Sequence, residues 1–348
     1  MTRSTFVVAL LVGSLLLVWS YQGRRAASGL VVYCAHDLVF AAPLLERFTD
    51  QTGIGVTIVG DTEASKSLGL VRRIEAEAAA PQGDVFWNNE TLGTIALAEA
   101  GRLTPYQGDG WNRMPGRFRD PDGRWTGLAG RLRVVVRRTG DETHNADARL
   151  AIADPMYGTT LTHAAVVWAR DDGATFRRMW PGLKSSDRTA VVAGNGPAMR
   201  LLSDRRASWC LTDTDDLFAI GRGQLAAGAI AFDARVPVDT LDPRTATESA
   251  VVMIPNTVAI IDGCDRMDDA RRLVDWLLSE STERALANSP ARQIPLGPTD
   301  PSSLPPLVQT GLGLVEESVD LRPLGPARTA VLAYLTDEAG GRDPAGQP

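Results

Sequence analysis

Short apolar segments alternate with stretches of helical periodicity along most of the chain. The segments 30–33 and 84–87 have the length and the apolar content of buried strands. Elsewhere apolar residues recur every three or four positions, as Leu68, Val71 and Ile74 do, which is the pattern of one buried helix face. This alternation predicts an α/β fold in which parallel strands are covered by helices.

The alternation occurs in two units, and 348 residues are enough for two folding units of ordinary size. The apolar run within residues 125–138 is predicted to cross between the units. The expected organisation is lobe 1 at 29–126 with a return segment at about 230–264, lobe 2 at 127–229 with C-terminal helices at about 265–336, and a disordered tail at 337–348.

The N-terminus carries an apolar run over residues 6–19, with arginines before and after it. This arrangement predicts an export signal within residues 1–28 and therefore a periplasmic or other extracytoplasmic location. The run is short for a membrane span, although a tilted helix of this length could cross a thin bilayer. Cleavage of the segment and its retention as a tether to the inner membrane both stay open.

Charge and cysteine content narrow the function further. A net charge of -6 and no basic cluster interleaved with aromatic residues exclude nucleic acid as a partner. The cysteines are Cys34, Cys210 and Cys264, at no spacing typical of a metal site. An exported protein could form a Cys210–Cys264 disulfide, but three buried, apolar cysteine side chains are the favoured interpretation.

Oxygen-bearing side chains follow three of the expected strands. The clusters are Asp61-Thr62-Glu63, Asn88-Asn89-Glu90 and Asp213-Thr214-Asp215-Asp216. Carboxylate and amide oxygens suit a hard cation, and the lack of Cys/His pairs argues against a zinc site. The predicted metal ligands are Glu63, Asp213, Asp215 and Asp216, with Thr62, Asn89, Glu90 and Thr214 as further ligand-binding candidates. The alternative for any one cluster is helix capping, but strand ends that share one sheet edge favour binding when taken together.

A fourth loop has a different chemistry. Tyr157-Gly158-Thr159-Thr160 places a glycine and two hydroxyls where a helix is expected to begin. Free N–H groups and the helix dipole attract anions at such a position, and a threonine N-cap is the equally weighted alternative. The remaining ligand-binding candidates are His36 and Asp37 after the first strand, Asn195 between two glycines, and Asn256 between the return strands.

At several of these positions the chain resembles the extracellular solute-binding proteins of ABC importers, of the ferric-iron-binding type. The resemblance extends over roughly residues 30–300 and rests on the segments 31–36, 52–56, 84–90, 99–106, 125–128, 158–160, 211–216, 254–258 and 293–296. It implies a type II periplasmic-binding-protein fold, with two α/β lobes joined by crossover strands that close over a solute.

The resemblance also implies a function, which is binding and not catalysis. Such a receptor captures ferric iron, Fe(3+), with a synergistic anion in the cleft between its lobes. It then delivers the solute, as a monomer, to a membrane permease with its ATPase. In iron-binding relatives a Glu after the second strand and a His at the first strand end can ligate metal, which points to Glu63 and to His36 or Asp37.

One departure from the family pattern weakens the inference of iron. The relatives use an adjacent tyrosine pair, and Thr214-Asp215 stands in that place here. A receptor for a small oxyanion or organic acid, such as a phosphonate bound through Asn89, Thr159, Thr160 and Asn256, is therefore the alternative. A metal-dependent hydrolase ranks lower, because the sequence has neither a G-x-S-x-G nor an H-E-x-x-H motif.

Overall fold

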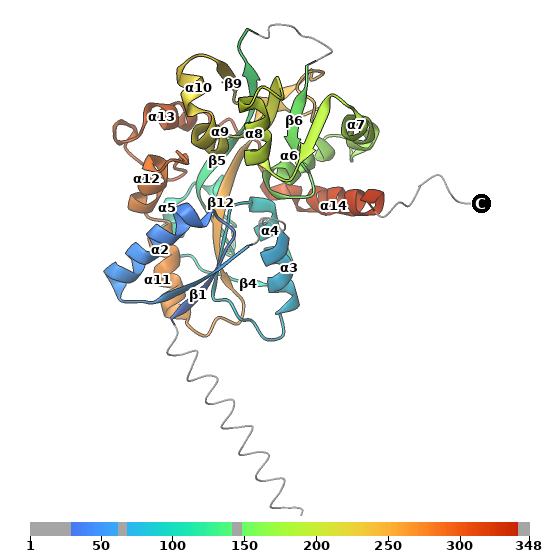
Figure 1. Cartoon of the computed structure of the whole chain (residues 1–348). Coiled ribbons are helices and arrows are strands. Elements are labelled where there is room, and N and C mark those ends of the chain that lie inside the picture. The colour runs from blue at the N-terminus through green and yellow to red at the C-terminus, as the bar shows by residue number, and fades with distance from the viewer. Residues whose placement is uncertain (1–28, 62–67, 141–147, 340–348) are drawn as a thin grey trace, which may run out of the picture.

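The computed structural model describes residues 29–61, 68–140 and 148–339, which form two α/β lobes, one above the other in Figure 1. A single curled sheet runs through both lobes in the order β2-β1-β3-β12-β5-β8-β6-β7, with β4 paired to β12 and β9 paired to β5. The mixed α/β, two-lobed fold class predicted from the sequence is thus confirmed.

Lobe 1 is the lower lobe in Figure 1. Its strands are β1 (Leu30–Cys34), β2 (Val56–Gly60), β3 (Val85–Asn88) and β4 (Leu103–Thr104), and β1 pairs in parallel with both β2 and β3. Its helices are α2 (Leu38–Thr52), α3 (Leu68–Ala76), α4 (Thr91–Glu99) and α5 (Asp109–Arg113). Gly53 ends α2 with a φ of 74°, a left-handed conformation that glycine adopts without a steric penalty.

Both faces of this part of the sheet are covered, which explains the apolar strands seen in the sequence. Leu30 and Val32 point to one face and pack in the same core cluster as Phe48 of α2. Tyr33, one position further along β1, points to the other face and packs in a second cluster with Val71 of α3. Successive strand residues alternate between faces, so a strand buried on both sides has no polar face to show.

Lobe 2 repeats this construction. Its strands are β6 (Leu150–Ala153), β7 (Thr189–Val192), β8 (Trp209–Asp213) and β9 (Ile230–Asp233), and its helices are α6 (Gly158–Ala169), α7 (Ala174–Ser185), α8 (Asn195–Ser203), α9 (Thr214–Ile220) and α10 (Arg222–Ala226). Strand β6 pairs in parallel with β7 and β8. The carboxyl ends of these three strands therefore meet at one edge, from which α6, α8 and α9 begin.

Two long strands connect the lobes. Strand β5 (Thr126–Arg138) pairs with β12 (Met253–Ile261) over its first half and with β8 over its second half, so it belongs to both lobes. This confirms the crossover predicted for residues 125–138. Pro255-Asn256 does not divide β12 into two strands, as the sequence had suggested, because an irregularity in register between these residues lets the strand continue.

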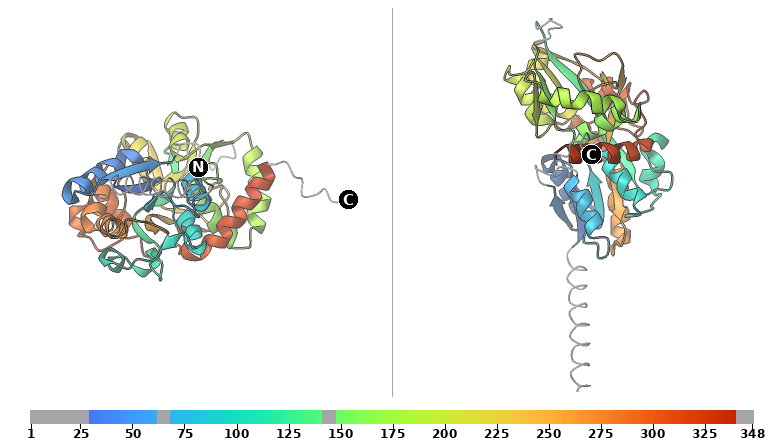
Figure 2. Two further views of the ribbon diagram at one scale, coloured as in Figure 1. Left: turned by 90° about the horizontal axis from the view of Figure 1, so that it is seen from below. Right: turned by 90° about the vertical axis from the view of Figure 1, so that its right-hand side faces the viewer.

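The chain then places helices against both lobes. They are α11 (Met267–Leu277), α12 (Glu280–Asn288), α13 (Pro306–Leu312) and α14 (Gly325–Ala339). Two short strands, β10 (Arg235–Pro237) and β11 (Ser249–Val251), form a separate antiparallel pair. Helix α11 packs on α5 and β12 in lobe 1, whereas α14 contacts both α6 and α4 and lies across the junction of the lobes (Figure 2). The exact lobe boundaries expected from the sequence stay a prediction.

Two further expectations concern the chain ends and the cysteines. Within the described residues, no helix has the length and apolarity that a bilayer span requires. The expected signal or anchor in residues 1–28, and the last nine residues of the expected tail, lie outside the described residues. All three cysteines are free thiols, and Cys34 and Cys210 are buried, as favoured from the sequence.

Candidate functional site

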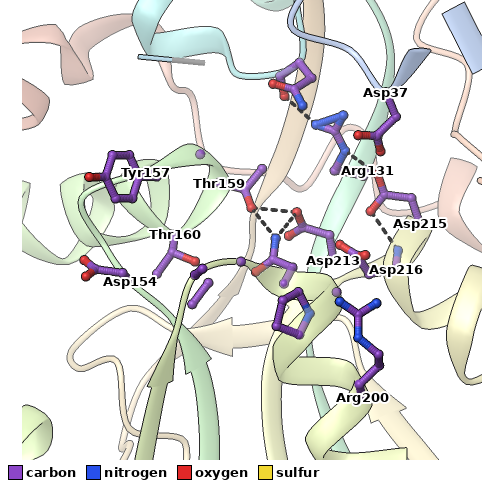
Figure 3. Close-up of a pocket in the computed structure, with 18 residues that line it drawn as sticks. Asp37, Arg131, Asp154, Tyr157, Thr159, Thr160, Arg200, Asp213, Asp215 and Asp216 are labelled. Carbon is purple, nitrogen blue, oxygen red and sulfur yellow. Dashed lines mark hydrogen bonds and ion pairs between the residues drawn. The ribbon is translucent and has the colours of Figure 1, made fainter. Parts of the chain in front are cut away.

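A cavity of about 600 Å³ opens between the lobes (Figure 3). Ten of the predicted site residues line it: Asp37, Asn89, Tyr157, Gly158, Thr159, Thr160, Asn195, Asp213, Asp215 and Asp216. Asp37 and Asn89 come from lobe 1 and the other eight from lobe 2. The volume falls in the usual range for small-molecule sites, and the lining is rich in polar and charged groups.

The lobe 2 wall is built from three helix N-termini. Helices α6, α8 and α9 follow β6, β7 and β8, and their N-cap residues are Tyr157, Gly194 and Asp213. The side chains of these N-cap residues make no capping hydrogen bond within the described part of the chain. In α9 the Asp216 N–H donates to the Asp215 carboxylate at 3.0 Å, whereas among the described residues no capping side chain stands at the start of α6 or α8, so these two helix N-termini favour negatively charged groups.

Asp213 is the centre of a buried network that holds two of these helices in place. Its carboxylate accepts from the Arg133 guanidinium at 2.7 Å, from the Thr159 hydroxyl at 2.6 Å and from the Asn195 amide at 2.8 Å. Arg133 is completely buried, so Asp213 is its counter-ion. Asp213 thus fixes the positions of Thr159 and Asn195 at the cavity wall, and its own oxygens already have partners.

Asp215 pairs with a second buried arginine, Arg131 of β5. Nε of Arg131 donates to Oδ2 of Asp215 at 2.8 Å, and the two side chains are 3% and 15% exposed. Burial raises the pKa of Asp215 to about 6, the Arg131 charge opposes the rise, and the carboxylates of Asp213 and Asp37 add to it. An acid in these surroundings is stabilised in its charged form when a cation approaches.

The acidic loop brings several carboxylates close together. One oxygen from each of Asp213, Asp215 and Asp216 lies within 4.8 Å of the others, a separation that one metal ion could bridge. Asp37 lines the same cavity from lobe 1 (Figure 3). Tyr157, the N-cap residue of α6, lines the same cavity as Asp215.

The other predicted site residues lie behind the cavity or outside the described part. The Glu90 carboxylate caps α4, accepting from the N–H groups of Leu92 and Gly93, both at 2.7 Å, and it also accepts from Thr162 of α6 at 2.6 Å. The Thr214 hydroxyl accepts from the backbone N–H of Leu132 at 3.2 Å. These contacts favour a structural role for Glu90 and Thr214, in which they hold helices and strands in place behind the cavity. Thr62 and Glu63 lie outside the described residues.

His36 and Asn256 are also buried behind the cavity. Nε2 of His36 lies 3.2 Å from the Gln293 amide nitrogen, and its ring packs edge-on against Trp87. Burial, together with the Arg131 charge, lowers the His36 pKa to about 4. The Asn256 amide oxygen accepts from Arg131 at 2.9 Å. Both residues support the site from behind, whereas the sequence suggested direct contact with the ligand.

Sequence reasoning missed three charged residues that line the cavity, namely Arg131, Asp154 and Arg200. Arg131 carried a usable signal, because it and Arg133 interrupt an otherwise apolar strand. A charged side chain within a buried strand requires a partner of opposite charge, so both arginines could have been matched with the acidic loop. Arg200 and Asp154 carried no comparable signal in the sequence.

Comparisons with known proteins agree with this architecture. No family model matches the chain. An Fe(3+)-binding periplasmic protein of Serratia marcescens is 30% identical over 131 residues, which cover 37% of this chain and 37% of that protein, so the chain is matched over little more than a third of the relative's length.

Solved structures match over nearly the whole chain. Iron-bound HitA from Pseudomonas aeruginosa has a TM-score of 0.70 at 20% identity, covering 90% of this chain and 99% of that one. The apo ferric ion-binding protein A of Pasteurella haemolytica has a TM-score of 0.73 at 16% identity, covering 91% and 99%. The resemblance found in the sequence is confirmed, and the chain has the two-lobed fold of the ferric-binding periplasmic proteins.

Proposed function

We propose that this protein is the solute-binding receptor of an ABC importer and that it captures ferric iron together with an anion. The observation that carries the proposal is the cavity between the lobes, where Asp37 of lobe 1 faces the Asp215-Asp216 pair of lobe 2. The relative from Serratia marcescens is named for Fe(3+) binding, and the two solved structures are named for bound iron or for ferric-ion binding. These names support ferric iron as the ligand.

The cation would be held by carboxylates. Asp215, Asp216 and Asp37 supply hard oxygen donors around one region of the cavity, and ferric iron prefers such donors. Asp213 contributes mainly by positioning, because Arg133, Thr159 and Asn195 already occupy its carboxylate. Carboxylates thus take the role for which the sequence resemblance implies a tyrosine pair.

The anion would be held by the N-terminus of α6. Gly158 has a φ of 56° and no side chain, so a ligand can approach the backbone N–H groups of the first turn closely. The hydroxyls of Thr159 and Thr160 line the same wall. A carboxylate or phosphate oxygen at this place would complete the coordination of the iron and gain from the helix dipole.

The receptor would capture the iron and its anion outside the cytoplasm and release them to a membrane permease. The ATPase of the permease would then drive transport into the cell. The receptor itself performs no reaction, so no residue is assigned a catalytic role. The N-terminal apolar run would deliver the chain across the membrane, as signal peptide or as tether.

Isothermal titration calorimetry of the purified chain tests the proposal. Ferric citrate should bind, and Asp215→Asn and Asp216→Asn should each weaken binding at least about tenfold, because each removes a charged oxygen donor. Asp268→Asn is the matched control, since the Asp268 side chain is 91% exposed on α11, away from the cavity. If both cavity variants bind ferric citrate as the unmodified chain does, the proposed metal site is wrong.

A further inference from the structure

Arg131 is the most highly connected cation at the cavity. Each of its three guanidinium nitrogens donates to a different element: Nε to Asp215 of α9, Nη1 to the carbonyl of Asn89 in the lobe 1 loop, and Nη2 to Asn256 of β12. The side chain is 3% exposed, yet it lines the cavity. A fixed positive charge therefore stands directly beside the carboxylate proposed to hold the metal.

The guanidinium is also held from behind. Asn256, which accepts from Nη2 of Arg131, uses its own amide to donate to the carbonyls of Leu128 and Ala129 at 3.2 and 2.8 Å, and to the Gln293 side chain at 2.8 Å. Arg131 and Asn256 lie on the two adjoining crossover strands, so they are not on a flexible loop. An incoming cation would have to act against this whole network to push Arg131 away.

We propose that Arg131 determines which form of the cation the cavity accepts, by selecting a metal bound in an anionic complex over the bare ion. This inference rests on the proposed function. A bare cation that binds Asp215 takes away the counter-ion of Arg131 and is repelled by the guanidinium. A complex that carries a free carboxylate or phosphate returns an anion to Arg131, so the buried arginine keeps a partner.

The size and charge of the cavity support this ligand class. About 600 Å³ exceeds the space that one ion needs and is comparable to sites for small organic molecules. A second arginine, Arg200 of α8, is exposed and lines the same cavity. The cavity thus offers carboxylates for a metal and guanidinium groups for the oxygens of its chelator.

Two substitutions that remove one positive charge from the same cavity provide the test. Arg131→Gln removes the counter-ion of Asp215, whereas Arg200→Gln removes an exposed arginine from the wall of the same cavity. The probes are Tb(3+) as a bare hard cation, followed by its luminescence, and ferric citrate as the anionic complex, followed by calorimetry. Circular dichroism and the melting temperature establish that each variant is folded.

Arg131→Gln should bind Tb(3+) about tenfold more tightly and ferric citrate about tenfold more weakly than the unmodified chain. Arg200→Gln should change the ratio of the two affinities by only about threefold, because the charge it removes is exposed and screened. Equal shifts in the two variants, or parallel weakening of both probes in Arg131→Gln, would overturn the inference. Opposite shifts cannot come from general loosening of the fold.

A second comparison keeps the inference testable should Arg131→Gln not fold. Asp215→Asn leaves Arg131 without its charged partner and should bind iron-free citrate about tenfold more tightly than Asp216→Asn does, although both lose one negative charge. Equal citrate affinities for these two variants would overturn the role of Arg131. If the unmodified chain binds neither ferric citrate nor Tb(3+), the proposed function fails as well, which is a different result.

Discussion

The Arg133–Asp213 pair makes the strongest prediction about stability. Arg133 is fully buried, and Asp213, with 3% of its side chain exposed, is its charged partner. Asp213→Asn keeps the shape of the side chain but removes the charge, and the neutral Thr159 and Asn195 cannot replace it. Leaving a buried charge without its counter-ion costs about 3–5 kcal/mol, so the free energy of unfolding should fall by that amount.

Urea-induced unfolding, followed by circular dichroism and tryptophan fluorescence, measures this loss. Asp268→Asn, at an exposed position, should stay within about 0.5 kcal/mol of the unmodified chain. The double variant Arg133→Met with Asp213→Leu should recover at least about 2 kcal/mol of the loss, because an apolar pair needs no counter-ion. A loss below about 1 kcal/mol in Asp213→Asn, or a double variant less stable than the single one, would refute the reasoning.

Three further predictions concern buried groups. Burial lowers the pKa of His36 from 6.5 to about 4 in the folded chain, so the imidazole binds its proton more readily when the chain is unfolded. The free energy of unfolding should therefore be highest above pH 6.5 and fall by about 3 kcal/mol as the pH is lowered to 4. Urea titrations at several pH values should show a smaller fall in His36→Asn. Glu90→Ala removes the cap of α4 and should cost about 1–2 kcal/mol of stability while changing ferric citrate affinity less than about threefold; a tenfold loss of affinity at unchanged stability would make Glu90 a ligand after all. Burial raises the pKa of Cys34 to about 12 and also raises that of Cys210, so neither thiol should react with iodoacetamide until the chain is unfolded, and mass spectrometry that finds either one labelled in the native protein would contradict this.

The sequence predicted the cavity largely because strand ends meet in space. The loops after β6, β7 and β8 could be located from apolar runs followed by Thr, Asn or Asp, and the parallel pairing of these strands brings the three loops together. Ten predicted residues therefore line one cavity, although they come from distant parts of the chain.

The sequence could not separate residues that face the cavity from residues that support it. Glu90 and Asp215 both follow a strand and both stand near a helix start, but Glu90 points back to cap α4 whereas Asp215 reaches into the cavity. The difference depends on side-chain direction, which the local pattern does not specify. The partners of Arg131 likewise come from residues up to 125 positions away, so only the folded chain identifies them.

Strand β5 has a consequence for the thermodynamics of the whole molecule. Its first half completes the lobe 1 part of the sheet and its second half completes the lobe 2 part, so neither part is whole without it. Melting of one lobe strips hydrogen bonds from a strand that the other lobe also needs. Calorimetry should therefore record a single cooperative endotherm, and expression of either lobe as a separate fragment should yield an unfolded polypeptide.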